Sequence, residues 1–293
     1  MIRFAILGTD SGHTEAYLEL MNLAHSPFKD RARITKIWGE DADQTKKKAS
    51  LFGVDTLCAN MEDALTDVDA TLVLGRFPES HFIPAKLSLE KKLPTFVDKP
   101  FVGNSKEARE LIAFSEKWGV PLVSFSAYRF AQDVVKLKND FKKDRYKSAL
   151  MTGPSQCNDL GPDPRFKDLS FYGIHSVEAL LEIFGNEVQS VYSMVKGNDV
   201  FGILSFKSGF QCFLNLLSGM PEEYYQLNLF GIGPPLTTTL KVEKELYENS
   251  LGQIIRYFSG GPTPVPLKSN LVALEVIEAM KKSDSVRAVE LRS

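Results

Sequence analysis

Short apolar runs alternate with amphipathic segments of helix length over residues 2–127. The strand-like runs occupy residues 2–8, 34–39, 70–75, 94–99 and 121–128. Between them, apolar residues recur three and four positions apart, as they do in helices, at residues 14–24, 44–53, 83–92 and 105–119. This alternation is typical of βαβ units, which build a parallel sheet flanked by helices. Residues 1–127 are therefore predicted to form an α/β domain with a doubly wound, Rossmann-type sheet.

After residue 128 the strand-like runs become longer and follow one another more directly. They are predicted at residues 190–196, 201–206, 210–217, 224–231, 236–242 and 252–258, with helical periodicity at 130–143, 173–185 and 269–282. Two of the strands flank the short turn Lys207-Ser208-Gly209, as in a β-hairpin. The sequence predicts a second, α+β domain over residues 128–293 with a mainly antiparallel sheet, and 293 residues suit two domains.

The composition disfavours several classes of partner. Lysine and arginine number 35 against 37 acidic residues, without the basic stripe that binding to a nucleic acid backbone requires. We find no charged leader and no apolar run of about 18 residues, so neither a membrane nor export is expected. Three widely spaced cysteines, without a CxxC pair, argue against a disulfide framework and a zinc site: Cys58, Cys157 and Cys212. A cytoplasmic location is expected.

The first strand ends in the turn Gly8-Thr9-Asp10-Ser11-Gly12-His13, where a doubly wound sheet binds its ligand. Gly8 supplies the tight turn, but Asp10 stands where a dinucleotide-binding turn has its second glycine. Like charges about 4 Å apart cost about 4 kcal/mol at an effective dielectric of about 20, so Asp10 beside a pyrophosphate needs compensation. Arg76 follows a strand adjacent to the first in the order 3-2-1-4-5-6, and we expect it to provide that compensation.

Other residues of this turn favour the binding of an anion. Ser11, Gly12 and His13 offer a hydroxyl, an open backbone and an imidazole at a helix N-terminus. An ordinary strand-to-helix turn with Asp10 as the helix cap is the alternative interpretation.

The choice between NAD and NADP depends on the residue after the second strand. An acidic residue there normally bonds the ribose hydroxyls of NAD. Gly39 falls at the expected position and Glu40 one place later, so both cofactors stay open. Lys46, Lys47 and Lys48 are interpreted as a solvated helix face rather than a phosphate site.

Several motifs occur in an order that resembles the Gfo/Idh/MocA oxidoreductases, relatives of glucose-fructose oxidoreductase and inositol dehydrogenase. FGV is followed by MEDAL, and RFPESHFIPAKLSLEKK stands where the family has T-P-N-x-x-H and a helix. VDKP matches its E-K-P, AYRF its N-R-R-F, and GIHSVEALLEIFG its G-x-H-x-x-D segment. The resemblance covers nearly the whole chain.

The resemblance implies a Rossmann domain, a second domain with an open antiparallel sheet, and hydride exchange between NAD or NADP and a small sugar- or polyol-like substrate. It implies self-association as a homodimer or homotetramer. The lysine of the motif matches Lys99, which would polarise the reacting oxygen, and the histidine matches His175, which would exchange the hydroxyl proton. The cofactor candidates are Gly8, Asp10, Ser11, Gly12, His13, Glu40, Arg76, Phe77, His81, Asp98, Lys99 and Arg129, and no metal is expected.

The sequence departs from the family near His175. Phe171 replaces the usual aspartate four residues earlier, which puts the proton relay in question. Tyr172 could donate a proton instead, and Glu178 lies on the same helical face as His175 and could orient its imidazole. The alternative roles are a surface lysine at Lys99, a helix-capping or core histidine at His175, packing at Tyr172 and solvation at Glu178.

Three other interpretations stay open. A catalytically silent relative could bind a ligand or cofactor as a sensor or scaffold, since Asp10, Gly39 and Phe171 all depart from the family pattern. A net reaction that is not redox, such as elimination through a transient ketone, is another. The spacing of Tyr192 and Lys196 matches short-chain dehydrogenases, but it falls in a predicted strand without their glycine-rich turn.

Overall fold

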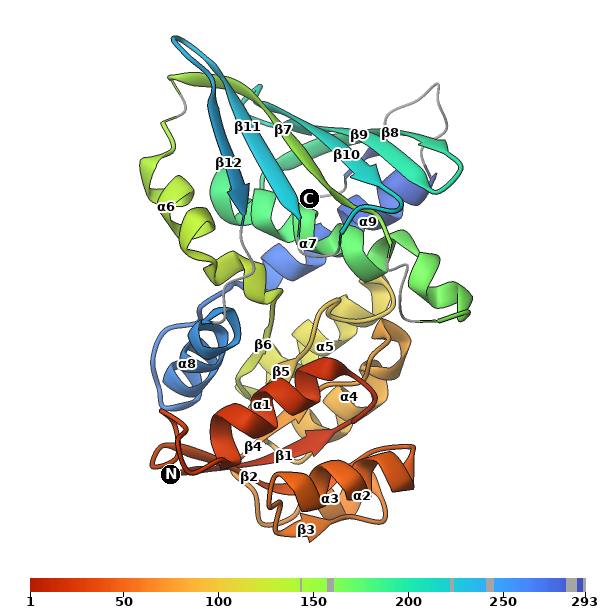
Figure 1. Ribbon diagram of the computed structural model, residues 1–293, viewed down its shortest axis with the longest axis vertical. Coiled ribbons are helices and arrows are strands. Elements are labelled where there is room, and N and C mark those ends of the chain that lie inside the picture. Colours follow the sequence, from red (N-terminus) through yellow and green to blue (C-terminus); the bar gives the residue numbers. More distant parts are fainter. Residues whose placement is uncertain (143, 157–160, 222–223, 241–244, 283–288, 292–293) are drawn as a thin grey trace. The chain divides into compact units, whose positions relative to one another are not determined.

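The computed structural model describes residues 1–142, 144–156, 161–221, 224–240, 245–282 and 289–291. The chain divides into two compact units (Figure 1). The first contains Met1–Phe125 and Tyr247–Leu267, and the second Ser126–Leu246 and Lys268–Ser293. The expected division after residue 127 takes no account of the segment that returns to the first unit.

The first unit is built on a six-stranded parallel sheet in the order β3-β2-β1-β4-β5-β6. This is the order that the sequence predicts, and the Rossmann-type fold is confirmed. Its strands are β1 (Ile2–Leu7), β2 (Ala32–Trp38), β3 (Thr56–Leu57), β4 (Ala70–Val73), β5 (Thr95–Val97) and β6 (Leu122–Ser124). Its helices are α1 (Gly12–Asn22), α2 (Ala42–Leu51), α3 (Met61–Ala64), α4 (Phe82–Glu90), α5 (Ser105–Trp118) and α8 (Leu246–Phe258), with the 3-10 turn η1 (Pro78–Ser80).

Local sequence explains where these elements begin and end. Strands β4, β5 and β6 are buried at every position, as central strands of a covered parallel sheet are. Helix α5 begins after Asn104, whose side chain accepts the backbone N–H of Glu107, and ends at Gly119, whose φ of 62° is left-handed. The glycine that closes the predicted helix 105–119 thus has the expected role.

Helix α8 corrects one prediction, because residues 252–258 were expected to form a strand. Read from residue 246, the apolar side chains Leu251, Ile254 and Ile255 recur at helical spacing, and all three are buried. The rings of Tyr247 and Phe258 contact those of Tyr17 and Phe4 in the first unit, at centroid distances of 6.2 Å each. These contacts draw residues 247–267 into the Rossmann unit.

The second unit has a seven-stranded sheet in the order β12-β11-β7-β10-β9-β8-β13. All neighbours are antiparallel except β7 and β10, so the expected mainly antiparallel sheet is confirmed. The strands are β7 (Tyr146–Pro154), β8 (Val188–Lys196), β9 (Asp199–Phe206), β10 (Gln211–Leu217), β11 (Tyr225–Gly231), β12 (Leu236–Leu240) and β13 (Val289–Glu290). The last two residues of the predicted strand 236–242 lie outside the described residues.

Helices cover one face of this sheet (Figure 1). They are α6 (Gln132–Asp140), α7 (Leu169–Phe184) and α9 (Leu267–Lys282), with the 3-10 turns η2 (Ala127–Phe130) and η3 (Pro164–Lys167). Buried residues alternate along β9 and β10, because every second side chain points toward the helices. The central strand β7 was missed by the sequence analysis, because its lysine, serine, glycine and proline hide its alternation.

The structure adds two observations on sites and membranes. Within the described residues, no group of histidine, cysteine and acidic side chains is arranged to hold a metal ion. Cys58 and Cys212 are buried free thiols, and Cys157 lies outside the described residues. None of the described helices combines the length and the apolarity that spanning a membrane would take.

Candidate functional site

The turn between β1 and α1 is held in a tight conformation. Gly8 has a φ of 93°, and a Cβ atom there would lie 2.6 Å from the backbone nitrogen of Gly75, at the end of β4. Ser11 is the N-cap of α1, with its hydroxyl 3.1 Å from the backbone nitrogen of His13. The cap is therefore Ser11 and not Asp10, and a Cβ at Gly12 would meet open space.

Asp10 and Arg76 meet at the carboxyl ends of β1 and β4, as the strand order predicts. The backbone N–H of Arg76 donates to the Asp10 carboxylate at 2.9 Å, and the Arg76 side chain donates through Nε to the backbone carbonyl of Asp10 at 2.6 Å. Part of the compensation for the Asp10 charge thus comes from the main chain of residue 76.

Two side chains of helix α2, Lys48 and Thr45, hydrogen-bond to the same turn. Lys48 is buried, and its ammonium donates to the backbone carbonyls of Thr9 at 2.7 Å and Ser11 at 3.2 Å. The hydroxyls of Thr9 and Thr45 are 2.7 Å apart. The interpretation of the lysine run as a solvated face is wrong for Lys48, because position 48 lies on the face of α2 that turns toward this loop.

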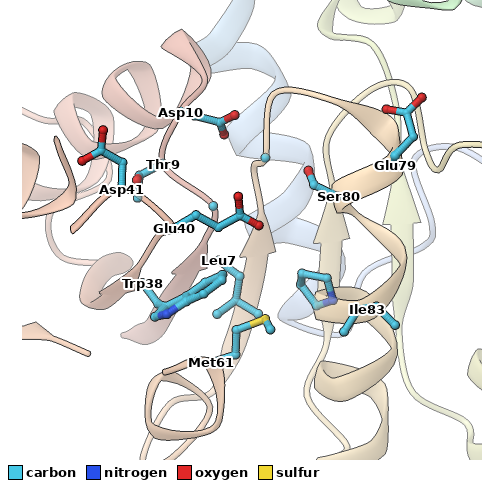
Figure 2. Close-up of a pocket in the computed structure, with 13 residues that line it drawn as sticks. Leu7, Thr9, Asp10, Trp38, Glu40, Asp41, Met61, Glu79, Ser80 and Ile83 are labelled. Atoms are coloured by element: carbon cyan, nitrogen blue, oxygen red, sulfur yellow. The ribbon is translucent and has the colours of Figure 1, made fainter. Parts of the chain in front are cut away.

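A pocket of about 440 Å³ opens at the carboxyl ends of β1, β2 and β4 (Figure 2). The residues that line it are Leu7, Gly8, Thr9, Asp10, Trp38, Glu40, Asp41, Met61, Gly75, Glu79, Ser80, Ile83 and Pro84. Figure 2 shows the Glu40 side chain extending into the pocket, with Leu7, Trp38 and Met61 gathered beside it. Four of the lining residues are acidic and none is basic, so the pocket combines an apolar wall with hydrogen-bond acceptors.

The structure explains why the acidic residue after β2 is Glu40 and not residue 39, where the sequence pattern places it. A Cβ at Gly39 would lie 2.1 Å from the Thr9 hydroxyl and 2.5 Å from that of Thr45, so no side chain fits there. Glu40 is the first residue after β2 whose side chain can reach the pocket, and Asp41 is occupied as the N-cap of α2.

On the other side of the β1–α1 turn, His13 bonds to Asp98. The His13 Nδ1 atom is 2.6 Å from Asp98 Oδ2, and Asp98 is buried at the end of β5, next to the buried Lys99. The ring of Tyr247 meets the imidazole edge-on, at a centroid distance of 5.2 Å. Burial by itself raises the pKa of Asp98, but the charges of His13 and Lys99 and the bond to His13 outweigh it and lower the pKa.

His81 and Phe77 lie away from the pocket lining. His81 is fully buried, with Nε2 at 2.7 Å from the carbonyl of Gly75 and Nδ1 at 2.9 Å from that of Pro100. These bonds join the segment after β4 to the segment after β5. Phe77, four residues before His81, is also buried. Their expected contact with a cofactor stays a prediction.

In the second unit, His175 lies in a buried polar network. Its Nδ1 atom is 2.7 Å from the hydroxyl of Ser126, and Glu178 accepts the backbone N–H of Ser126 at 2.7 Å. Glu178 also accepts from Arg129 Nε at 2.7 Å. Through Ser126, Glu178 is thus linked to the imidazole that it was expected to orient. Sequence analysis missed Ser126, although its position directly before AYRF could have drawn attention to it.

Arg129 and the aromatic residues complete this network. Arg129 is 1% exposed and also bonds Glu182 at 2.9 Å and Ser269 at 2.9 Å. Tyr172 places its ring 5.5 Å from that of His175, and the ring of the buried Phe171 contacts those of Phe166 and Tyr172. Phe171 is therefore part of the core. The partners of Arg129 include Glu178 and Glu182, which belong to the second unit as Arg129 does. Lys99 belongs to the first unit.

Comparisons with known proteins agree with this geometry. Residues 2–125 match the family model GFO_IDH_MocA, described as an oxidoreductase family with an NAD-binding Rossmann fold. The uncharacterised oxidoreductase YhhX of Escherichia coli is 23% identical over 203 residues, which are 60% of this chain and 56% of the relative. The match thus spans little more than half of that relative's length.

Two solved structures share the fold over the whole chain. GenD2 from gentamicin A biosynthesis, crystallised with NAD, has a TM-score of 0.85 at 16% identity and covers 100% of this chain and 97% of its own. The myo-inositol dehydrogenase of Lactobacillus casei, crystallised with NAD(H) and myo-inositol, has a TM-score of 0.83 at 13% identity, with the same coverage. Residues 2–125 of this chain thus match the Gfo/Idh/MocA oxidoreductase family, the family that its motifs resemble.

Proposed function

We propose that this chain is an NAD(H)-dependent oxidoreductase that exchanges a hydride with the CH–OH group of a small sugar- or polyol-like substrate. The observation that carries the proposal is the Glu40 carboxylate in a pocket beside the tight Gly8 turn. This is the arrangement that bonds a ribose diol and brings backbone N–H groups to a pyrophosphate. The open space at Gly12 and the Ser11 cap of α1 fit the same ligand.

Cofactor choice follows from charge. A ribose 2′-phosphate beside Glu40 and Asp41 would meet two carboxylates, each costing about 4 kcal/mol at about 4 Å and an effective dielectric of about 20. A ribose 2′-hydroxyl would instead donate to Glu40. The pocket therefore favours NAD(H) over NADP(H).

The reaction needs a polarised substrate oxygen and a proton acceptor. Bound NAD would supply the hydride acceptor. Lys99 is proposed to donate from its ammonium to the substrate oxygen, and His175, held by Ser126, to hydrogen-bond to the same substrate. The ion pairs of Arg129 with Glu178 and Glu182 keep the helix that carries His175 in a fixed conformation.

Calorimetric titration tests this proposal. NAD+ is expected to bind, and NADP+ to bind at least about 100-fold more weakly, since even part of the repulsion estimated above exceeds about 2.7 kcal/mol. Glu40→Gln should reduce this preference, whereas Glu62→Gln, on the exposed surface of α3, should leave it unchanged. If neither dinucleotide binds, the proposed function is wrong.

A catalytically silent, ligand-binding protein is the second candidate. Phe171 favours it, since a buried ring stands where the family has an aspartate. A screen of sugars and polyols for NAD+ reduction separates the two candidates. Tight NAD+ binding without reduction by any of these substrates would support the silent protein.

Self-association is also proposed, through the face of the second sheet that none of the described helices covers (Figure 1). Strand register puts Phe213 and Phe230 on one face of that sheet, and they are 41% and 40% exposed. Met194, which pairs with Phe201 on the same face, is 44% exposed. A second copy that covers these side chains would give a homodimer or homotetramer, and light scattering at the 32.7 kDa monomer mass across dilution would contradict this.

A further inference from the structure

His13 has the hydrogen bonding of an imidazole prepared to accept a proton. Asp98 is buried and its pKa is lowered, because His13 and Lys99 outweigh the effect of burial, so its carboxylate is ionised and can only accept. The 2.6 Å contact therefore places a proton on His13 Nδ1, which donates to Asp98. In the neutral ring, Nε2 then carries the lone pair.

The Nε2 edge of this imidazole is open to a ligand. The His13 side chain is 22% exposed, and no other residue in the described part of the chain hydrogen-bonds to Nε2. The edge-on ring of Tyr247 and the bond to Asp98 fix the plane of the imidazole from two sides. The ring is thus oriented by its surroundings while its basic nitrogen has no protein partner among these residues.

Sheet topology places His13 and Asp98 at the reacting end of the proposed cofactor site. Glu40 lies after β2, on the half of the sheet that takes the adenosine. Asp98 follows β5, in the opposite half formed by β4, β5 and β6, which takes the second mononucleotide. His13 and Asp98 therefore belong to the nicotinamide end, directly beside Lys99.

The two candidate imidazoles have different partners. His175 Nδ1 meets the hydroxyl of Ser126, which carries no charge, and the nearby Glu178 is engaged by Arg129 and by the backbone. His13 meets an ionised carboxylate, which stabilises an imidazolium and fixes the tautomer. Asp98 thus gives His13 the kind of partner that Phe171 cannot give His175.

We propose that His13, held by Asp98, accepts the proton of the substrate hydroxyl; this inference rests on the proposed function. The substrate O–H bond breaks and its proton passes to His13 Nε2. The hydride leaves the same carbon for oxidised nicotinamide, and the C–O bond becomes a carbonyl. The Asp98 carboxylate balances the imidazolium charge until the proton is released to solvent, and His175 keeps a neutral hydrogen-bonding role.

Acylation of histidines by diethyl pyrocarbonate, mapped by peptide mass spectrometry, tests this placement on the unaltered protein. The reagent attacks neutral imidazole nitrogens that it can reach, which makes His13 and the exposed His25 its targets. NAD+, at a concentration shown by calorimetry to saturate the protein, should slow the reaction of His13 by roughly tenfold, since bound ligands are mostly enclosed. The reaction of His25 should keep its rate.

The two proposals fail in different ways. If calorimetry shows that NAD+ binds and His13 still reacts at its original rate, the role of His13 is overturned while the proposed function stands. If NAD+ does not bind, the proposed function fails and the inference fails with it. Equal slowing of His13 and His25 would indicate a general loss of reactivity and would also contradict the specific placement.

Discussion

The surroundings of His13 and His175 differ in one physical respect, the charge of the hydrogen-bond partner. Asp98 offers His13 an ionised carboxylate within the Rossmann unit, whereas Ser126 offers His175 a hydroxyl within the second unit. A motif identifies which histidine a family retains, but an imidazole that takes up a proton needs a partner that stabilises the resulting charge. Divergence at one position, Phe171, can therefore be compensated at a residue in a different part of the chain.

Replacing each histidine in turn tests this contrast with the largest expected effect. His13→Gln should lower kcat by about 100- to 10,000-fold, the usual contribution of a general base, while NAD+ affinity changes little. His175→Gln should lower kcat by about tenfold or less, since it removes a neutral hydrogen bond. His25→Gln, on the exposed surface, is the matched control.

The rates are measured with the substrate that the NAD+ reduction screen identifies. If His175→Gln lowers kcat more than His13→Gln does, the proton acceptor is His175, the histidine of the family motif, and not His13.

Restoring the family aspartate is expected to damage the fold. Phe171 is 5% exposed and its ring contacts those of Phe166 and Tyr172. Phe171→Asp would remove this packing and bury a charge, so the free energy of unfolding should fall by about 3 kcal/mol or more without a gain in activity. Phe171→Leu is the control for packing alone. Higher activity in Phe171→Asp, with stability retained, would show that His175 can act as the proton acceptor once the aspartate of the family pattern is restored.

Changing the two partners compares charge with hydrogen bonding. Asp98→Asn keeps the shape of the side chain and removes its charge, and it should lower kcat by about 10- to 100-fold, as the loss of a charged hydrogen bond does. Ser126→Ala should lower it by less than about tenfold, since a neutral bond contributes less. Ser126→Thr should restore most of that loss if the hydroxyl itself is what positions His175. Equal effects of Asp98→Asn and Ser126→Ala would remove the distinction between the two sites.

The smallest expected effect is on stability in acid. The pKa of Asp98 is lowered in the folded protein, so its carboxylate stabilises the fold above the unfolded value near 3.8. This stabilisation is lost as the pH falls from about that value through the lower folded one. Asp98→Asn should therefore flatten the dependence of the free energy of unfolding on pH in this range, measured by urea denaturation. An unchanged slope would show that Asp98 carries no such charge interaction.

The features that could be predicted from the sequence are those encoded locally or by known topology. Apolar runs and helical spacing were sufficient for the doubly wound sheet. The strand order then brought Asp10 and Arg76 together, although they are 66 positions apart. The role of Glu40 stayed open in the sequence, because Gly39 occupies the position where the acidic residue is expected, and only the fold shows that a side chain at position 39 would meet Thr9 and Thr45.

The features that were missed depend on packing between distant segments. Helix α8 was mistaken for a strand because its apolar stripe is visible only when residues 246–251 are included. Lys48 resembles its exposed neighbours in the lysine run, and only the fold turns it toward the carbonyls of Thr9 and Ser11. The contact of His13 with Asp98 joins residues 85 positions apart. Neither the turn that contains His13 nor the VDKP segment that contains Asp98 indicates by itself that the two side chains meet.

The most direct test of the central claim is the two-bond 1H–15N correlation spectrum of the histidine rings, recorded without and with NAD+. A His13→Gln sample assigns the His13 signals. We predict that His13 carries its proton on Nδ1, that its Nε2 resonance shifts when NAD+ binds, and that the signals of the exposed His25 do not move. A His13 ring protonated on Nε2 alone, or one that does not respond to bound NAD+, would contradict the account.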